Sequence, residues 1–335
     1  MILYGLIILV LVSLGLRNPV ARPFDKDIVT VLKPLLALGI VLHHLHSQSV
    51  FLHEFERWGP VIVGFFFFIS GYGLYYSYNN NPSYMKNFVI KNILQKLVIP
   101  IILAYFLNLL LNERCINTYS FSEHLTNPSG PSFFPNDWFL YALIFCYIVF
   151  MMVTKMKHIQ LVFLACIILA FVIVTAVSGF ARNWWATPLS FLVGAFYYHH
   201  ESNIRNLVNG KERLLLSTVF YFLVFGALMA GSYYYHSKVT TVLAYSLLPL
   251  LLVNCLIRVN VSSLAKNRCI LFLSRISFEI YLVHGIIINF LRQRLDLSGF
   301  ILAITTLPIT LVGAFLFHEL IHLCQKPIEL KKHVI

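Results

Sequence analysis

Residues 161–177 read LVFLACIILAFVIVTAV, an apolar run without a charged side chain. The run lacks the apolar–polar alternation of a membrane β-strand, and a backbone in lipid must satisfy its polar groups within a helix or a closed barrel. Its length approaches the ~20 residues that an α-helix needs to cross the hydrocarbon core. The run therefore predicts a membrane-spanning helix and argues against a barrel.

The composition of the whole chain extends this interpretation. Of the 335 residues, 59% are hydrophobic and 11% are charged, which is more apolar surface than one water-soluble core can bury. We therefore expect an all-α, polytopic transmembrane helical bundle. Its first and seventh helices are short enough to be tilted, re-entrant or interfacial. Eleven helices are predicted near residues 2–16, 28–46, 59–78, 92–111, 137–154, 159–178, 185–199, 213–232, 238–257, 271–291 and 298–322.

Lysine and arginine residues are distributed unevenly over the predicted loops. Most of the 25 fall in alternate segments, beginning with Arg17, Arg22 and Lys26 after the first helix, and the positive-inside rule places these segments in the cytosol. The N-terminus is then outside and the C-terminus cytosolic. The basic residues form no tract or stripe, so the net charge of +12 indicates topology and not nucleic-acid binding.

The segments around the first helix and the longest loop complete the expected organisation. No basic segment precedes the first helix and no small-residue cleavage site follows it, which favours a retained anchor over a removable signal peptide. The longest loop, about residues 112–136, is expected outside, where it could cap a site. The six cysteines show no disulfide framework and no zinc spacing.

The second predicted helix contains KPLLALGIVLHHLH, residues 33–46. At about 100° per residue, Lys33 and His44 fall within roughly 20° of one face, and the helical rise separates them by about 16 Å. His43 and His46 point about 100° and 140° away from that face. A cation and an imidazole on one face of a membrane helix suggest a polar passage. The alternative is that Lys33 snorkels to one interface and His44 simply lies at the other.

Two further helices carry polar groups in apolar surroundings. GPVIVGFFFFISGYGL, residues 59–74, contains Ser70 in a small-residue pair that is more typical of helix packing than of chemistry. LSRISFEIYLVHG, residues 273–285, places Arg275, Glu279, Tyr281 and His284 in one span. Arg275 and Glu279 are four positions apart and can pair. Ionisable groups in a membrane favour a functional site over a purely structural ion pair.

These motifs together resemble acyltransferase family 3, a family of integral-membrane acyltransferases. Its first core helix carries a basic residue, ten spacer residues and a histidine, which here are Lys33 and His44, with lysine where arginine is more usual. The similarity covers about residues 26–327 and leaves the first helix as an addition to a ten-helix core. The other matching motifs are FFFFISGYGL at 65–74, Lys91, Lys96 and Pro100 in KNILQKLVIP, Trp138, Phe139 and Leu140, and SFEIYLVH at 277–284.

The resemblance implies an anchor helix and linker over residues 1–25 and a membrane acyltransferase domain over 26–335. It implies transfer of an acetyl or other short acyl group from acetyl-CoA or another acyl-CoA to a hydroxyl of a saccharide or lipid-linked saccharide, in a bacterial cytoplasmic membrane and without a metal. The lysine at position 33 weakens any claim of bidentate phosphate contact. Gln325 stands where the family often has an acid, so this tail receives no role.

The resemblance also assigns roles to individual residues. His44 is the expected catalytic residue, either as a general base with an ordinary pKa of about 6.5 or as a transient acyl carrier. The sequence leaves both routes open. The residues expected to hold the CoA phosphates are Lys33, Lys91 and Lys96. The residues expected to support the site are Ser70, Trp138, Arg275, Glu279, Tyr281 and His284.

Other interpretations of the same sequence compete with this one. A transporter or flippase would have a similar number of spans and similar buried charges, but the two halves of the chain show no internal symmetry. A metal site built on His43, His44, His46 and His53 is disfavoured, because the first three point to different sides of one helix.

Overall fold

The computed structural model describes residues 10, 13–14, 20–112, 133–156 and 159–330, and within these ranges the regular structure is helical throughout. The predicted first helix at 2–16 and most of the loop at 112–136 lie outside the described residues. The elements are α2 (Lys26–His44), η1 (His46–Gln48), η2 (Val50–Arg57), α3 (Gly59–Asn80), η3 (Tyr84–Asn87), the π-helix η4 (Val89–Val98), α4 (Ile99–Leu111), α6 (Trp138–Val153), α7 (Gln160–Val177), α8 (Arg182–Ala186), α9 (Leu189–Val208), α10 (Lys211–Tyr234), α11 (Lys238–Leu256), α12 (Ser262–Ala265), α13 (Arg268–Arg275), α14 (Ser277–Arg294) and α15 (Gly299–Leu330).

The lengths and hydropathies of these helices confirm a polytopic helical membrane protein. Among the described residues, 7 helices are long and apolar enough to cross a membrane, and the bent pair α13–α14 makes up to 8. The apolar helix α6 is shorter. Helix α10 turns most of its apolar surface outward, for example Leu216 and Leu223, as expected for a helix whose solvent is lipid.

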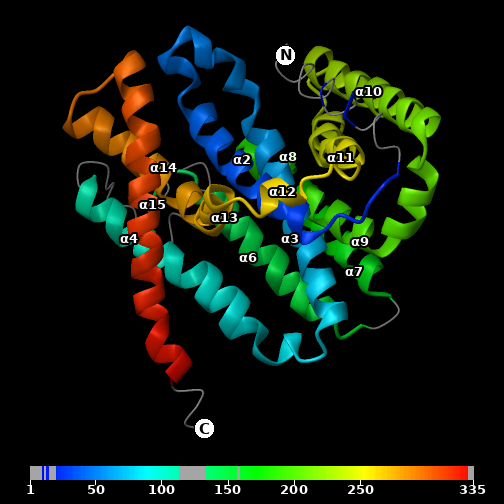
Figure 1. The fold of residues 1–335 in the computed structure, drawn as a ribbon, viewed down its shortest axis with the longest axis horizontal. Coiled ribbons are helices and arrows are strands. Elements are labelled where there is room, and N and C mark those ends of the chain that lie inside the picture. Colours follow the sequence, from blue (N-terminus) through cyan, green and yellow to red (C-terminus); the bar gives the residue numbers. More distant parts are fainter. Residues whose placement is uncertain (1–9, 11–12, 15–19, 113–132, 157–158, 331–335) are drawn as a thin grey trace.

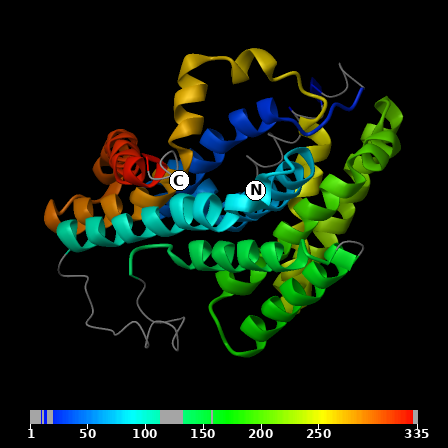
Figure 2. The same ribbon diagram turned by 90° about the horizontal axis from the view of Figure 1, so that it is seen from below.

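The helices form a bundle with α2, α3 and α6 at its centre. Helices α4, α14 and α15 lie on one side of these three, and α9, α10 and α11 lie on the other (Figures 1 and 2). Helix α2 contacts both α3 and α14. A residue on α2 can therefore face either half of the bundle.

The bundle has a proximal end, where α2 begins, and a distal end, where α2 finishes. At the proximal end the Arg22 amide donates to the Ile257 carbonyl over 2.8 Å, and at the distal end the Gly299 amide donates to Gln48 Oε1 over 3.2 Å. Each bond joins segments that the alternation of charged loops assigns to the same side of the membrane. Both bonds agree with the predicted sides of these four segments.

Helices α3 and α9 approach one another more closely than most side chains would allow. A Cβ added to Gly71 would lie 2.0 Å from the Phe191 carbonyl oxygen, and one added to Gly194 would lie 2.1 Å from the Phe68 carbonyl oxygen. Only glycine permits such contact between helix backbones. The small-residue motif after the phenylalanine run therefore serves to bring these two helices together.

The prediction of one continuous helix over residues 271–291 is wrong. The segment forms α13 and α14, which meet at 63°. Helix α13 has its own N-cap, because Asn267 Oδ1 accepts the Cys269 amide over 2.9 Å, and Ser277 Oγ donates to the Ser274 carbonyl at the junction over 2.9 Å. Local side-chain bonds at both positions thus define two helices.

The prediction of a seventh helix over residues 185–199 also needs correction. A break at Thr187 and Pro188 separates the short α8 from α9, which continues to Val208. Proline has no amide to continue the hydrogen bonding of a preceding helix. The five residues of α8 contact α7, α11 and α6.

Candidate active site

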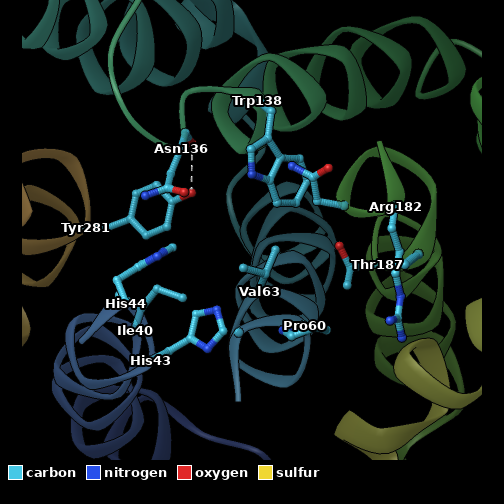
Figure 3. A pocket seen from close by; sticks show the side chains of 13 residues that line it. Ile40, His43, His44, Pro60, Val63, Asn136, Trp138, Arg182, Thr187 and Tyr281 are labelled. Carbon is cyan, nitrogen blue, oxygen red and sulfur yellow. Dashed lines mark hydrogen bonds between the residues drawn. The ribbon is translucent and has the colours of Figure 1, made fainter. Parts of the chain in front are cut away.

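A cavity of about 340 Å³ opens at the distal end of the bundle. Its volume lies within the range of small-molecule sites. Its walls come from α2, α3, the segment that precedes α6, the region of α8, and α14 (Figure 3). The lining residues are Ile40, His43, His44, Gly59, Pro60, Val63, Asn136, Trp138, Arg182, Asn183, Ala186, Thr187 and Tyr281.

His44 lies at the last position of α2 and lines this cavity. Its ring centroid is 5.1 Å from that of His284 on α14, with the two rings tilted by 31°. The His43 ring is 4.8 Å from the His44 ring. The His44 ring therefore lies near another imidazole of its own helix and near one from α14.

His284 is buried and its hydrogen bonds define its tautomer. Its Nδ1 lies 2.6 Å from the Tyr281 carbonyl oxygen and 3.2 Å from that of Ile280. Since a carbonyl only accepts, Nδ1 carries the proton. Its Nε2 is 3.4 Å from Asn136 Nδ2 and can accept from that amide. His284 is thus a neutral ring that supports His44.

Tyr281 and Asn136 hold the segment that precedes α6 against α14. The Tyr281 hydroxyl donates to the Asn136 carbonyl over 3.0 Å (Figure 3). The neighbouring Gly285 is needed for this contact, because a Cβ there would lie 2.6 Å from Pro135 Cβ. Tyr281 lines the cavity, but its proton is already used in positioning Asn136.

His43 also faces the cavity, which the helical-phase argument did not predict. Its Nδ1 lies 3.0 Å from the Phe55 carbonyl oxygen of η2, so Nδ1–H donates to that carbonyl. A Cβ on Gly59 would lie 2.4 Å from His43 Nε2. The cavity extends from α14 across to α3, and it therefore reaches more than one face of α2.

The opposite wall is formed by Trp138, Arg182, Asn183 and Thr187. Figure 3 shows Arg182 on the far side of the cavity from His44. Arg182 Nη2 donates to the Tyr245 hydroxyl over 2.9 Å, and its Cζ lies 5.3 Å from the centre of that ring. Sequence analysis missed Arg182, although it is the sole cation in a short predicted outer loop.

A group of lysines lies toward the proximal end. Lys33 is within electrostatic range of Lys96 and Glu279, and Lys96 is within range of Lys91. Lys96 Nζ also donates to Asn92 Oδ1 over 3.1 Å. Lys96 is thus near both Lys33 and Lys91, and we refer to these three residues as the lysine cluster. Lys33 itself is not among the residues that line the distal cavity.

Arg275 and Glu279 meet through a third residue that sequence analysis did not identify. Arg275 Nε donates to His318 Nε2 over 2.9 Å, and His318 Nδ1 donates to Glu279 Oε1 over 2.7 Å. His318 on α15 thus bridges the two residues. The sequence analysis had considered a direct pair between Arg275 and Glu279. The sequence signal was the group of ionisable residues at 318–322, HELIH, within an apolar helix.

Ser70 lies away from the cavity lining, on α3, where it shares a hydrogen bond with the Tyr147 hydroxyl. This contact fits a packing role between α3 and α6. The four histidines at 43, 44, 46 and 53 do not form a metal cluster in the part of the chain that the structure describes. Instead, His43 and His46 each bond a backbone carbonyl, and exposed His53 lies 3.6 Å from Glu56.

Comparison with known proteins identifies the family. A family model described as an acyltransferase domain matches residues 27–319, which is most of the chain. No curated protein and no solved structure gives a match. The match includes the imidazoles of α2 and α14, the lysine cluster and the wall that carries Arg182. The chain belongs to acyltransferase family 3.

Proposed function

We propose that this protein transfers an acyl group, usually acetyl, from acyl-CoA at the proximal end to a hydroxyl of a saccharide acceptor in the distal cavity. One observation carries the proposal: α2 runs from Lys33 in a cationic cluster to His44 in the wall of a ligand-sized cavity. The donor needs a site for phosphates and the acceptor needs a base. One helix supplies both.

The proximal end is assigned to the cytosol and the distal end to the exterior. This orientation follows from the concentration of lysine and arginine in the loops that gather at the proximal end. Acyl-CoA is a cytosolic metabolite and a cell-envelope saccharide lies outside, so the orientation presents each substrate to its own site. We assign the protein to a bacterial cytoplasmic membrane because the motifs it shares with its family imply that location.

The lysine cluster is suited to the headgroup of CoA. Lys33 and Lys96 both raise the electrostatic potential at the proximal end of the bundle. Clustered ammonium groups attract phosphate. The thioester arm would then extend along α2 from Lys33 toward Ile40, which is about two turns further along the helix and lines the cavity. A reactive carbonyl would in this way reach His44.

His44 would act as the base. Its imidazole takes the proton from the acceptor hydroxyl while the oxygen attacks the thioester carbonyl, and the carbon–sulfur bond then breaks. The departing CoA thiolate recovers the proton from the imidazole. In the two-step alternative, an imidazole nitrogen first takes the acyl group and releases CoA, and the acceptor hydroxyl then removes the acyl group from that nitrogen.

The remaining cavity wall has the features of a saccharide site. Trp138 offers a broad apolar face, and Asn136, Asn183 and Thr187 offer hydrogen-bonding groups. Sugars present both apolar ring faces and hydroxyls, and small-molecule sites combine aromatic surfaces with a few placed polar groups in the same way.

The test uses purified protein reconstituted in liposomes, with acetyl-CoA and a cell-envelope saccharide fraction. Release of free CoA thiol and acetylation of the saccharide are measured together. We expect His44→Ala to lower both by a factor of at least ~10², while His53→Ala, on exposed η2, retains the wild-type rate. Full activity of His44→Ala would refute the proposal. Saccharide movement across the membrane without thiol release would favour a transporter.

A further inference from the structure

The cavity contains a cation that the proposed reaction does not use. Arg182 lies on the wall opposite His44, so it cannot contact the same atoms of a substrate as the base. It therefore meets a part of the acceptor that is remote from the reacting hydroxyl.

Tyr245 holds the guanidinium in place from one side. The Tyr245 ring is buried and packs against Arg182, and its hydroxyl accepts from Nη2 over 2.9 Å. A guanidinium has five N–H donors, and within the described residues this bond to Tyr245 is the one that Arg182 makes. The described residues thus leave most of its donors for a ligand, on a group that Tyr245 already orients.

The described part of the cavity lining offers Arg182 no counter-charge. Among the described residues that line the cavity there is no aspartate or glutamate. The neighbouring carboxylate, that of Asp137, is buried and accepts the Phe133 amide over 2.9 Å and the Tyr141 hydroxyl over 3.4 Å. The carboxylate of Asp137 is therefore occupied in holding the start of α6.

We propose that Arg182 recognises an anionic group on the acceptor, either a carboxylate, as in a uronic acid, or a phosphate. This inference rests on the proposed function, because it names the class of acceptor for that site. A guanidinium binds either anion through paired N–H donors. The Arg182 side chain is exposed, so an anionic group on the acceptor can reach the guanidinium while Tyr245 holds it in place.

The experiment measures binding without the acyl donor, so its outcome does not depend on catalysis. Titration calorimetry on detergent-solubilised protein compares methyl glucuronide, glucose 6-phosphate and methyl glucoside. We expect at least one anionic probe to bind ten-fold or more tightly than the neutral glucoside. The anionic probe whose affinity exceeds that of the neutral glucoside by the larger factor identifies carboxylate or phosphate as the preferred group.

Variants connect that preference to the named side chains. Arg182→Gln should reduce the affinity for the anionic probe to that for the neutral glucoside and leave the affinity for the glucoside unchanged. Arg182→Lys should keep part of the preference, because the charge remains but the paired donors are lost. Tyr245→Phe should have an intermediate effect, since it removes the hydrogen bond to Arg182 and retains the ring.

The outcomes separate this inference from the proposed function. Equal affinity for charged and neutral probes in the wild type, or no binding of either anion, would overturn the role of Arg182. A preference that persists in both Arg182 variants would overturn it as well. A clear anion preference without thiol release in the acyl-transfer assay would support the inference and count against acyl transfer.

Discussion

The rings of His44 and His284 lie 5.1 Å apart between centroids, on helices α2 and α14. His284 is buried and bonds the Tyr281 carbonyl through Nδ1, so it is the fixed member of the pair. His44 lines the cavity and is the member that can meet a substrate. The position of the proposed base thus depends on packing against a ring from another helix.

Variants at His284 should separate packing from hydrogen bonding. His284→Ala leaves a void beside His44, and we expect it to lower both the unfolding temperature and the rate of transfer. His284→Phe refills most of that volume, so it should recover the unfolding temperature and part of the rate. Thermal unfolding and thiol-release assays check this. A wild-type rate in the alanine variant would show that His44 does not need this neighbour.

Gly59→Ala should displace the ring of His43. The added Cβ would come within 2.4 Å of His43 Nε2, and the ring can move because it is the end of a flexible side chain. We expect normal folding and a lower kcat, because the ring would intrude on the place of the acceptor. Gly73→Ala on the same helix α3 is the matched control, since a Cβ there meets nothing within 4 Å. Equal rates in the two variants would contradict the prediction.

Substitutions in the lysine cluster should act on the donor alone. We expect Lys33→Met and Lys96→Met each to raise the KM for acetyl-CoA by about ten-fold at low salt, because each removes a cation from the phosphate site. Lys33→Arg should lower that KM, since arginine can contact phosphate in a bidentate manner.

Lys155→Met provides the control for the lysine variants. Lys155 lies in an exposed turn after α6, and the adjacent Thr154 carbonyl accepts from Tyr78 near the end of α3. The KM for acetyl-CoA should not change in this variant. A rise in the KM for the acceptor, with no rise for the donor, in Lys33→Met would show that the cluster does not bind CoA.

Gly71→Ala should destabilise the protein. The new Cβ would lie 2.0 Å from the Phe191 carbonyl oxygen, so the backbones of α3 and α9 must separate at a cost of about 1–3 kcal/mol or more. Gly226→Ala on α10 has open space around it and should be neutral or slightly stabilising. Thermal unfolding in detergent compares the two. Similar unfolding temperatures would mean that the helices can adjust.

The helical spans could be predicted because the signals for them are local. An apolar run of sufficient length needs a helix wherever it lies, and the Lys33 to His44 spacing sets their common face without reference to other helices. The bend between α13 and α14 could not be predicted in the same way. The residues at this junction also contact α15, because Arg275 bonds His318, which is 43 positions away in sequence.

Half of the candidate site could not be predicted from the sequence, for a related reason. His43 faces the cavity because η2 folds back to accept its Nδ1–H, and Arg182 does so because Tyr245 supports it from α11. Neither contact leaves a periodic signal in the sequence. The special role of His318 could be predicted from the sequence, because an ionisable residue in an apolar span already indicates such a role.

The contact of α3 and α9 through Gly71 and Gly194 has a consequence for how this scaffold can be altered. Main-chain atoms set the spacing of those helices, so exchanging the side chains at 182–187, just before α9, would leave the spacing intact. Acceptor preference could then be redesigned or drift within that short stretch, while the imidazoles and the thioester route stay where they are. The scaffold would in this sense be modular, with a replaceable recognition segment beside an invariant reaction centre.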